Sequence, residues 1–162
     1  HTRYIGDWSS DVCSSDLHIA RWADSASPSL FLNERNRAFY QELALALADK
    51  KWLLLSVVEL DDRPLTMHYG FDFNERLLWY KPSFDRVHSK HSPGLVLLRH
   101  LIGYALDRKR VEFDFTIGDE PFKSRFSNCT RKTVSIQIYQ DPVRYYLALS
   151  KQKLSAAKRS LV

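Results

Sequence analysis

The chain has 162 residues, of which 44% are hydrophobic and 27% are charged, and its formal net charge is +5. This composition is typical of a globular domain and excludes a disordered, collagen-like or coiled-coil chain, and the length suits one domain. No apolar run approaches the roughly 20 residues that span a bilayer. Two cysteines, Cys13 and Cys129, cannot build a disulfide framework, so we expect a reducing, cytoplasmic location.

The first 17 residues, His1–Leu17, differ from the rest of the chain because they show neither apolar periodicity nor the hydrophobic core of a signal peptide. The stretch from Gly6 to Leu17 resembles the translation of a common sequencing adapter, and we interpret residues 1–17 as a non-native leader. The leader holds one arginine and three aspartates, so the remainder carries +7. We expect the native protein to begin further upstream and this chain to be its C-terminal part.

The first half of the remaining chain predicts a helix followed by a β-meander. After a loop over residues 18–33, Asn33 is a preferred N-cap for a helix over 34–50, where Phe39, Leu43 and Leu47 recur at a spacing of four. Three β-rich runs follow, and the short turns between them indicate antiparallel neighbours. The three runs are residues 52–60, 65–73 and 76–81.

The second half begins with a loop over 82–91 and a clear helix start. Ser92 is a preferred N-cap residue and Pro93 suits the first helical turn, and the helix is expected to end near 108–110. Strands and helices then alternate. We expect a strand at 111–116, a short helix at 120–126, a strand at 133–139 and a helix at 142–162. The predicted fold class is therefore α/β with a mixed sheet, an antiparallel meander followed by α-β-α-β and a C-terminal helix, with residues 34–141 as the domain.

Positive charge gathers at the C-terminal end. No acidic residue follows Asp141, and five basic residues do, which leaves +2 for residues 18–141. Nucleic-acid-binding domains usually cluster Lys and Arg on the folded face itself, so we expect no nucleic-acid partner. The basic amphipathic helix at 142–162 is predicted to dock or to face a partner, with contact to an anionic membrane surface as the alternative.

Familiar catalytic motifs are absent from the sequence. It contains no GxxxxGK[ST], GxGxxG, GxSxG or HExxH pattern. His88 and His91 lack the further Cys or acidic ligands of a metal site, so no metal is expected. Cys129 has no evident histidine base and is interpreted as an ordinary thiol.

The run Ser92-Pro93-Gly94-Leu95 is a candidate anion site. Gly94 lets a ligand approach the first turn closely, and the unpaired amides and dipole of a helix N-terminus suit a pyrophosphate. The same residues fit a plain Ser-Pro helix start equally well, so both interpretations stay open.

A second candidate site lies at and after the strand predicted at 111–116. Asp114 stands between Phe113 and Phe115, where an aspartate is costly to bury unless it is hydrogen-bonded or functional. Polar groups at the carboxyl end of a strand fit a substrate crevice. The charged residues that follow are Asp119, Glu120 and Lys123. The structural alternatives are a buried network for Asp114 and helix capping for the two acids after it.

In their order and spacing these segments resemble the GNAT-type acyl-CoA N-acyltransferase superfamily, within it CelD-like and FemAB-like acetyltransferases. The resemblance covers about a hundred residues, from Phe39 to about Ile138. Its specific parts are Tyr80-Lys81 followed by Phe84-Asp85, Ser92-Pro93-Gly94, and the segment from Asp114 to Lys123. Ile117 and Phe122 depart from the branch, which often has Arg and Tyr there.

The resemblance implies an acyl-CoA co-substrate whose pyrophosphate lies near Ser92, Pro93, Gly94 and Leu95. The thioester would enter between splayed strands at 76–81 and 111–116, where a backbone N–H stabilises the oxyanion. An amine, deprotonated by a carboxylate or by water, would attack it. The candidate bases are Asp114, Asp119 and Glu120, and the candidate substrate-binding residues are Lys81 and Lys123, the latter positioning an anionic substrate.

We therefore expect an N-acyltransferase that acts on a small amine, and the resemblance suggests a link to cell-envelope or exopolysaccharide metabolism. The domain is expected to be truncated at its N-terminus, with the N-terminal lobe of the parent protein as a missing partner. Two alternatives stay open: a non-catalytic GNAT-like binding lobe, and a FemAB-like transferase that uses aminoacyl-tRNA and would need a basic groove.

Overall fold

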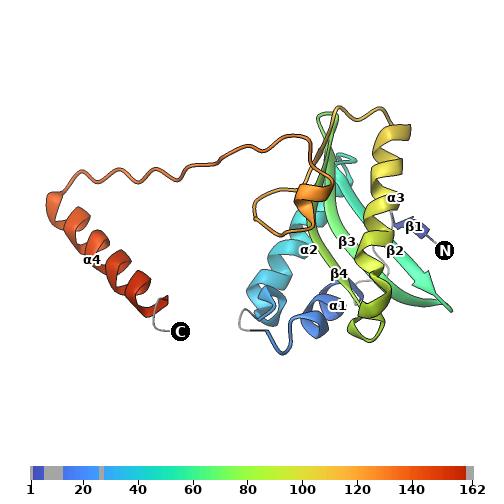
Figure 1. The fold of residues 1–162 in the computed structure, drawn as a ribbon, viewed down its shortest axis with the longest axis horizontal. Helices are drawn as coiled ribbons and strands as arrows, with labels where there is room; N and C mark the ends of the chain where they lie inside the picture. The colour runs from blue at the N-terminus through green and yellow to red at the C-terminus, as the bar shows by residue number, and fades with distance from the viewer. Residues whose placement is uncertain (1, 6–12, 26–27, 160–162) are drawn as a thin grey trace. The chain divides into compact units, whose positions relative to one another are not determined.

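The computed structural model describes residues 2–5, 13–25 and 28–159. The chain divides into two units, His1–Glu120 and Pro121–Val162, and each is described by itself. The first unit contains one β-sheet with helices on both of its faces (Figure 1). The second contains a short 3-10 helix and one long α-helix.

The sheet is mixed, with five strands in the spatial order β1-β2-β3-β4-β5. Neighbours from β1 to β4 are antiparallel, and β5 is parallel to β4, which confirms the predicted mixed α/β sheet with its meander. Asn74 and Glu75 adopt positive φ angles of 50° and 59°, the left-handed geometry of a tight hairpin turn. The strands are β1 (Thr2–Ile5), β2 (Leu53–Leu60), β3 (Arg63–Phe73), β4 (Arg76–Phe84) and β5 (Glu112–Asp114).

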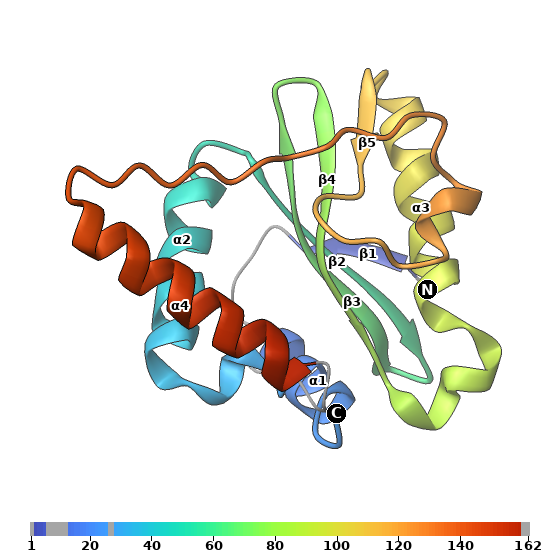
Figure 2. The ribbon, with the colours of Figure 1, turned by 60° about the vertical axis from the view of Figure 1, so that its left-hand side comes forward.

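Helices α1 (Cys13–Arg21) and α2 (Glu34–Ala48) lie on one face of the sheet, and α3 (Pro93–Asp107) lies on the other (Figures 1 and 2). Leu97, Leu98 and Leu101 of α3 are fully buried, as expected of its apolar stripe. Asn33 caps α2 as predicted, because its side chain accepts a hydrogen bond from the Arg35 amide at 2.9 Å. On α2, however, Phe39 is exposed, and the buried residue is Ala44.

Two expected loops contain regular structure. Within residues 18–33, α1 continues to Arg21 and a 3-10 helix, η1, spans Leu30–Leu32. Within 82–91, β4 continues to Phe84 and a second 3-10 helix, η2, spans Arg86–His91. β1 and the start of α1 fall within residues 1–17, of which 1 and 6–12 lie outside the described residues. The non-native origin of that leader stays a prediction.

The second unit corrects two further predictions. In place of a helix over 120–126 there is only a 3-10 turn, η3 (Lys123–Arg125), where the Ser124 hydroxyl donates to the Pro121 carbonyl at 2.9 Å, a local contact that competes with helical hydrogen bonds. The described residues of this unit contain no strand, although one was expected at 133–139. An alternation of apolar and polar residues shows that one side of a segment is apolar. A strand also needs a neighbouring strand that pairs with its backbone N–H and C=O groups. Helix α4 (Pro142–Arg159) agrees with the predicted C-terminal helix.

Among the described residues, no helix is both long enough and apolar enough to cross a membrane.

Candidate functional site

Strands β4 and β5 pair over only three residues and then separate. The parallel register joins Arg76 to Glu112 and continues to Leu78 and Asp114, where β5 ends while β4 runs on to Phe84. The Thr116 hydroxyl donates to the Trp79 carbonyl at 3.1 Å just beyond this point. From Tyr80 onward, no described strand pairs with β4 on its β5 side, as expected of a splayed pair.

A β-bulge on β4 lies at the point of separation. Tyr69 of β3 pairs with Lys81, but Phe71 pairs with Leu78. An advance of two residues along β3 therefore corresponds to three residues along β4. The extra residue leaves the Tyr80 amide without a backbone partner on β3. A bulge beside a strand separation is a place where backbone groups become available to a ligand.

The imidazole of His68 occupies this irregularity. Its Nε2 accepts a hydrogen bond from the Tyr80 amide at 3.3 Å, and the ring stacks on the Trp79 indole with the centroids 4.9 Å apart. Burial lowers the pKa of His68 to about 3, so the ring is neutral at pH 7. Gly70 makes room for it: a Cβ there would lie 2.0 Å from His68 Cε1 and 2.5 Å from the Leu78 carbonyl oxygen.

The first turn of α3 is open at Gly94. Among the described residues, a Cβ on Gly94 would meet only Phe84 Cδ1, at 3.7 Å, so none of their side chains fills the space beside this backbone. Ser92 stands at the N-cap position as predicted, but it has left-handed φ and ψ of 52° and 50° and its side chain makes no capping hydrogen bond. Its carbonyl oxygen accepts from the Leu95 amide at 2.9 Å. Pro93 is buried and has no amide hydrogen to offer.

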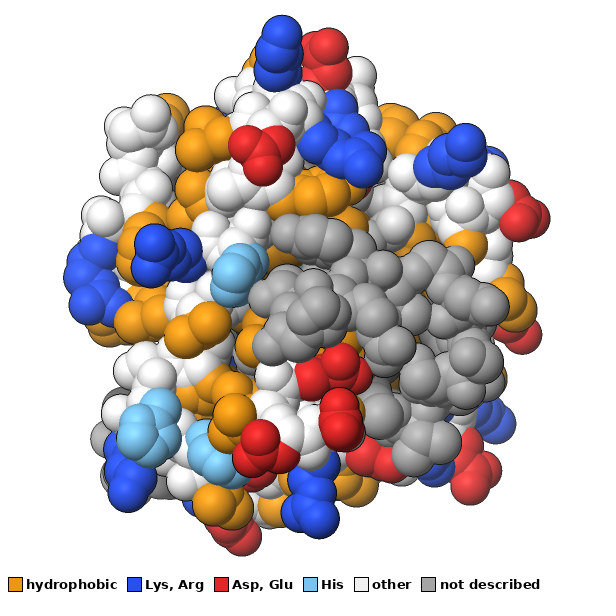
Figure 3. Space-filling view, turned by 90° about the vertical axis from the view of Figure 1, so that its right-hand side faces the viewer, with side chains coloured by type: hydrophobic (Ala, Val, Ile, Leu, Met, Phe, Trp, Pro, Cys, Tyr) orange, Lys and Arg blue, Asp and Glu red, His pale blue; other side chains and the backbone are white. Residues whose placement is uncertain are grey.

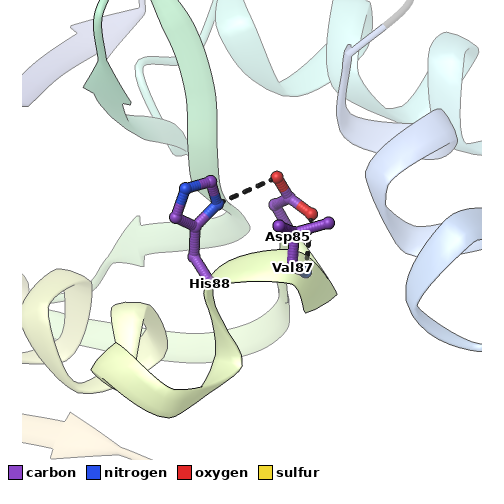
Figure 4. A network of polar contacts seen from close by, with 3 residues as sticks. All are labelled: Asp85, Val87 and His88. Atoms are coloured by element: carbon purple, nitrogen blue, oxygen red, sulfur yellow. Dashed lines mark hydrogen bonds and ion pairs between the residues drawn. The ribbon is translucent and has the colours of Figure 1, made fainter.

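The loop that leads into α3 is held by Asp85. One carboxylate oxygen accepts from the Val87 amide at 3.0 Å, and the other lies 3.1 Å from His88 Nδ1 (Figure 4). Asp85 and His88 also line a hollow of about 440 Å³ beside the β2–β3 turn. His88 therefore has a carboxylate partner within its own loop. No described cluster of three or more His, Cys, Asp or Glu side chains is placed to hold a metal ion.

The predicted acids occupy different environments. Asp114 is half-buried at the end of β5, beside Leu78, and its Oδ1 accepts from the Thr116 amide at 2.7 Å. Asp119 and Glu120 are exposed in the following loop, where no α-helix begins that they could cap. Lys123 opens η3 in the second unit, so its position relative to these acids is not described.

Lys81 lies on the sheet face that α1 and α2 cover, within an aromatic cluster. Its Nζ is 4.7 Å from the Tyr80 ring centroid and 5.6 Å from that of Tyr40 on α2. The hydroxyls of Tyr40 and Tyr80 lie 2.8 Å apart, and the Tyr69 hydroxyl donates to the Tyr40 carbonyl at 3.1 Å. Burial raises the pKa of Tyr40 and of Tyr69, so both phenols stay protonated at pH 7.

Sequence reasoning did not single out Tyr40, His68 or Gly70. A glycine inside a strand often marks a bulge or a close approach, so Gly70 carried a usable signal. The contacts of Tyr40 and His68 depend on which side chains the fold brings together, and no local sequence pattern predicts them.

The two units differ in charge. Residues 1–120 hold 15 Lys and Arg against 18 Asp and Glu, a net charge of −3, whereas residues 121–162 hold nine against one, a net charge of +8. On the face shown in Figure 3, basic side chains stand singly or in small groups among hydrophobic, acidic and uncharged ones.

The sequence matches the family model described as the acetyltransferase (GNAT) domain over residues 14–124, more than half of its length. The chain belongs to this family, and transfer of an acyl group from a CoA thioester to an amine is the general activity that membership indicates. No protein with a curated description matches the sequence.

Two solved structures are similar to the chain. One is an aminoglycoside antibiotic 6′-N-acetyltransferase from Acinetobacter haemolyticus, with 13% identity, a TM-score of 0.54, and coverage of 87% of this chain and 99% of that one. The other is a glucosamine-6-phosphate N-acetyltransferase from Arabidopsis thaliana, with 11% identity, a TM-score of 0.49, and coverage of 87% and 98%. At such low identity the first similarity establishes the fold alone.

Proposed function

We propose that the protein is an acyl-CoA-dependent N-acyltransferase that moves an acetyl group from acetyl-CoA to an amine. The observation that carries this proposal is the separation of β4 from β5 at Leu78, next to the β4 bulge. In a chain of the GNAT family, this opening offers unpaired strand edge to a thioester.

The pyrophosphate of the co-substrate would rest against Ser92, Pro93, Gly94 and Leu95. The open space at Gly94 supports this assignment, since a phosphate needs close access to backbone amides at a helix N-terminus. Lys90 and His91 are the basic residues that directly precede this turn.

The reaction would proceed by direct attack of the amine nitrogen on the thioester carbonyl. The new C–N bond forms, the C–S bond breaks, and the CoA thiol leaves. A base must accept a proton from the amine. We propose Asp114 for this role because it is half-buried beside the β4 bulge, with Asp119 and Glu120 as the other candidates. Lys81 and Lys123 are proposed to bind the acceptor.

Several finer assignments belong to the same proposal. The resemblance of Ser92-Pro93-Gly94 and of Asp114–Lys123 to CelD-like and FemAB-like acetyltransferases suggests a role in cell-envelope or exopolysaccharide metabolism, together with an N-terminal lobe of the parent protein. We propose a cytoplasmic location on the basis of cysteine usage. The basic helix α4 is proposed to contact a partner or an anionic membrane surface.

The test is an acetyl-transfer assay with acetyl-CoA and a panel of small amines, in which free CoA thiol and the mass of the product are followed together. The proposal predicts equal amounts of thiol and acetylated amine. A folded sample that binds no acetyl-CoA by calorimetry would instead support a non-catalytic lobe. Consumption of aminoacyl-tRNA without acetyl-CoA would support the third alternative.

A further inference from the structure

Two cationic side chains on the α1/α2 face of the sheet have no acidic partner in the part of the chain that the structure describes. Among the described residues, neither Lys81 nor Arg21 forms an ion pair, whereas the neighbouring Arg86 lies 2.6 Å from Asp24. Both are half-buried. A half-buried cation without a counter-ion is costly, because part of its hydration is lost without compensation.

The groups around Lys81 and Arg21 hold these side chains in place but do not neutralise their charge. The Arg21 guanidinium donates one hydrogen bond to the Pro82 carbonyl at 2.9 Å and lies 4.4 Å from the Phe84 ring centroid. Its other N–H groups donate no hydrogen bond to a described residue and can serve a ligand. The Lys81 ammonium contacts the two tyrosine rings described above, and such cation–π contacts attract the charge without neutralising it.

His18 of α1 reports the local electrostatics. Its pKa is lowered to about 4, first by burial and then by the positive charges of Lys81 and Arg21. Its Nδ1 lies 2.8 Å from the Ser29 hydroxyl, a neutral partner. Among the residues that the structure describes, no acidic group contributes to this shift, and both charges that do are positive. Arg21 and Phe84 also line a hollow of about 340 Å³ together with the ion-paired Asp24 and Arg86, and this hollow, which Lys81 does not line, leaves room for a ligand group beside Arg21.

We propose that Lys81 and Arg21 form a subsite for an anionic group, a carboxylate or a phosphate, carried by the amine acceptor. This inference rests on the proposed acyl transfer, since it assigns one side of the sheet to the acceptor. Lys81 follows Tyr80 of the bulge and lies on the α1/α2 face. Helix α3, whose first turn is proposed for the pyrophosphate, covers the opposite face (Figure 2), and Phe84 lies between this first turn at Gly94 and the Arg21 guanidinium.

The first test needs no turnover and uses inorganic phosphate as the probe. The imidazole resonances of His18, assigned with His18→Gln, are followed by NMR at pH 7 during a phosphate titration. We expect a saturable shift in the millimolar range that disappears in Lys81→Gln. Lys50→Gln is the matched control, because Lys50 also lies over an aromatic ring, Trp52 at 4.9 Å, but at the end of α2. No response, or an equal response in Lys81→Gln, overturns the subsite.

The second test separates the acceptor from the co-substrate as the source of the anion. Matched acceptors are compared: glucosamine 6-phosphate with glucosamine, and alanine with alaninamide. We expect Lys81→Gln to raise the KM for the anionic acceptor of each pair about tenfold, because one charge-assisted contact is lost. The KM for the neutral acceptor and the Kd for acetyl-CoA should stay unchanged. A weaker acetyl-CoA Kd with unchanged acceptor KM assigns the cations to CoA and overturns the proposal. If the protein binds phosphate near His18 but does not bind acetyl-CoA, the proposed acyl transfer is refuted and the anion subsite is retained.

Discussion

The imidazole Nε2 of His68 accepts the hydrogen bond of the Tyr80 amide, across two neighbouring strands and at 3.3 Å. The β4 bulge deprives the Tyr80 amide of a backbone acceptor in the sheet, and the His68 imidazole takes the place of that acceptor. Because Gly70 leaves the ring its space, the bulge depends on all three residues together.

Gly70→Ala should destabilise the protein by at least about 1–3 kcal/mol, the usual cost of overpacking a buried site. The added methyl group meets the ring of His68 and also the backbone carbonyl of Leu78, which cannot move without disturbing β4. Urea unfolding measures the loss. Gly103→Ala is the control: it lies within α3 with nothing within 4 Å of the new Cβ, so it should stabilise by about 0.5–1 kcal/mol. A neutral Gly70→Ala would contradict the described packing.

His68 should make stability depend on pH. Its pKa is about 3 in the folded state, against 6.5 for an unperturbed histidine, so between these values the unfolded chain binds a proton that the folded chain does not. Stability is therefore complete above about pH 6.5 and falls as the pH is lowered towards 3, by up to about 1.4 kcal/mol per pH unit. The lowered pKa of His18 acts in the same direction, over the interval from 6.5 to about 4.

His68→Phe tests this assignment by unfolding measurements at several pH values. The variant keeps a ring against Trp79 but loses both the titration and the acceptor for the Tyr80 amide. It should be less stable at pH 7 and show a shallower loss of stability towards low pH. His100→Gln, on the exposed side of α3, should retain the wild-type slope. An unchanged slope in His68→Phe would assign the acid sensitivity to other groups.

Asp114→Asn should lower kcat by about 10²–10⁴ if the carboxylate is the general base. An asparagine keeps an oxygen that can accept from the Thr116 amide, so the turn after β5 and the midpoint of thermal unfolding should change little. Steady-state kinetics and thermal unfolding of the same sample check both expectations. Full activity in a folded Asp114→Asn protein would remove Asp114 from the mechanism and leave it a structural role.

The parts of the fold that could be predicted from the sequence have strong local signals. Asn74-Glu75 marked a tight turn, and Ser92-Pro93 marked the start of α3. The continuation of β4 through Pro82 was missed because proline usually ends a strand. Pro82 is tolerated because it lies beyond Leu78, where β4 has lost its neighbour β5 and become an edge.

The candidate site was predictable only where it is local in sequence. Gly94 and Asp114 could be selected from the residues beside them, and the structure places the one at an open helix start and the other beside the bulge. The pairing of Tyr40 with Tyr80 joins residues 40 positions apart. The lack of an acidic partner for Lys81 among the described residues is likewise a property of the packed face, which the spacing of residues in the sequence does not predict.

Calorimetric titration of acetyl-CoA into the wild-type protein and Gly94→Ala tests the central claim most directly. The account predicts micromolar binding to the wild type and an affinity about tenfold weaker for Gly94→Ala, because a methyl group would stand between the phosphates and the first turn of α3. The melting temperature should hardly change, since this methyl group meets only Phe84, at an ordinary contact distance of 3.7 Å. Equal affinities for the two proteins, or no binding by a folded wild type, would contradict the account.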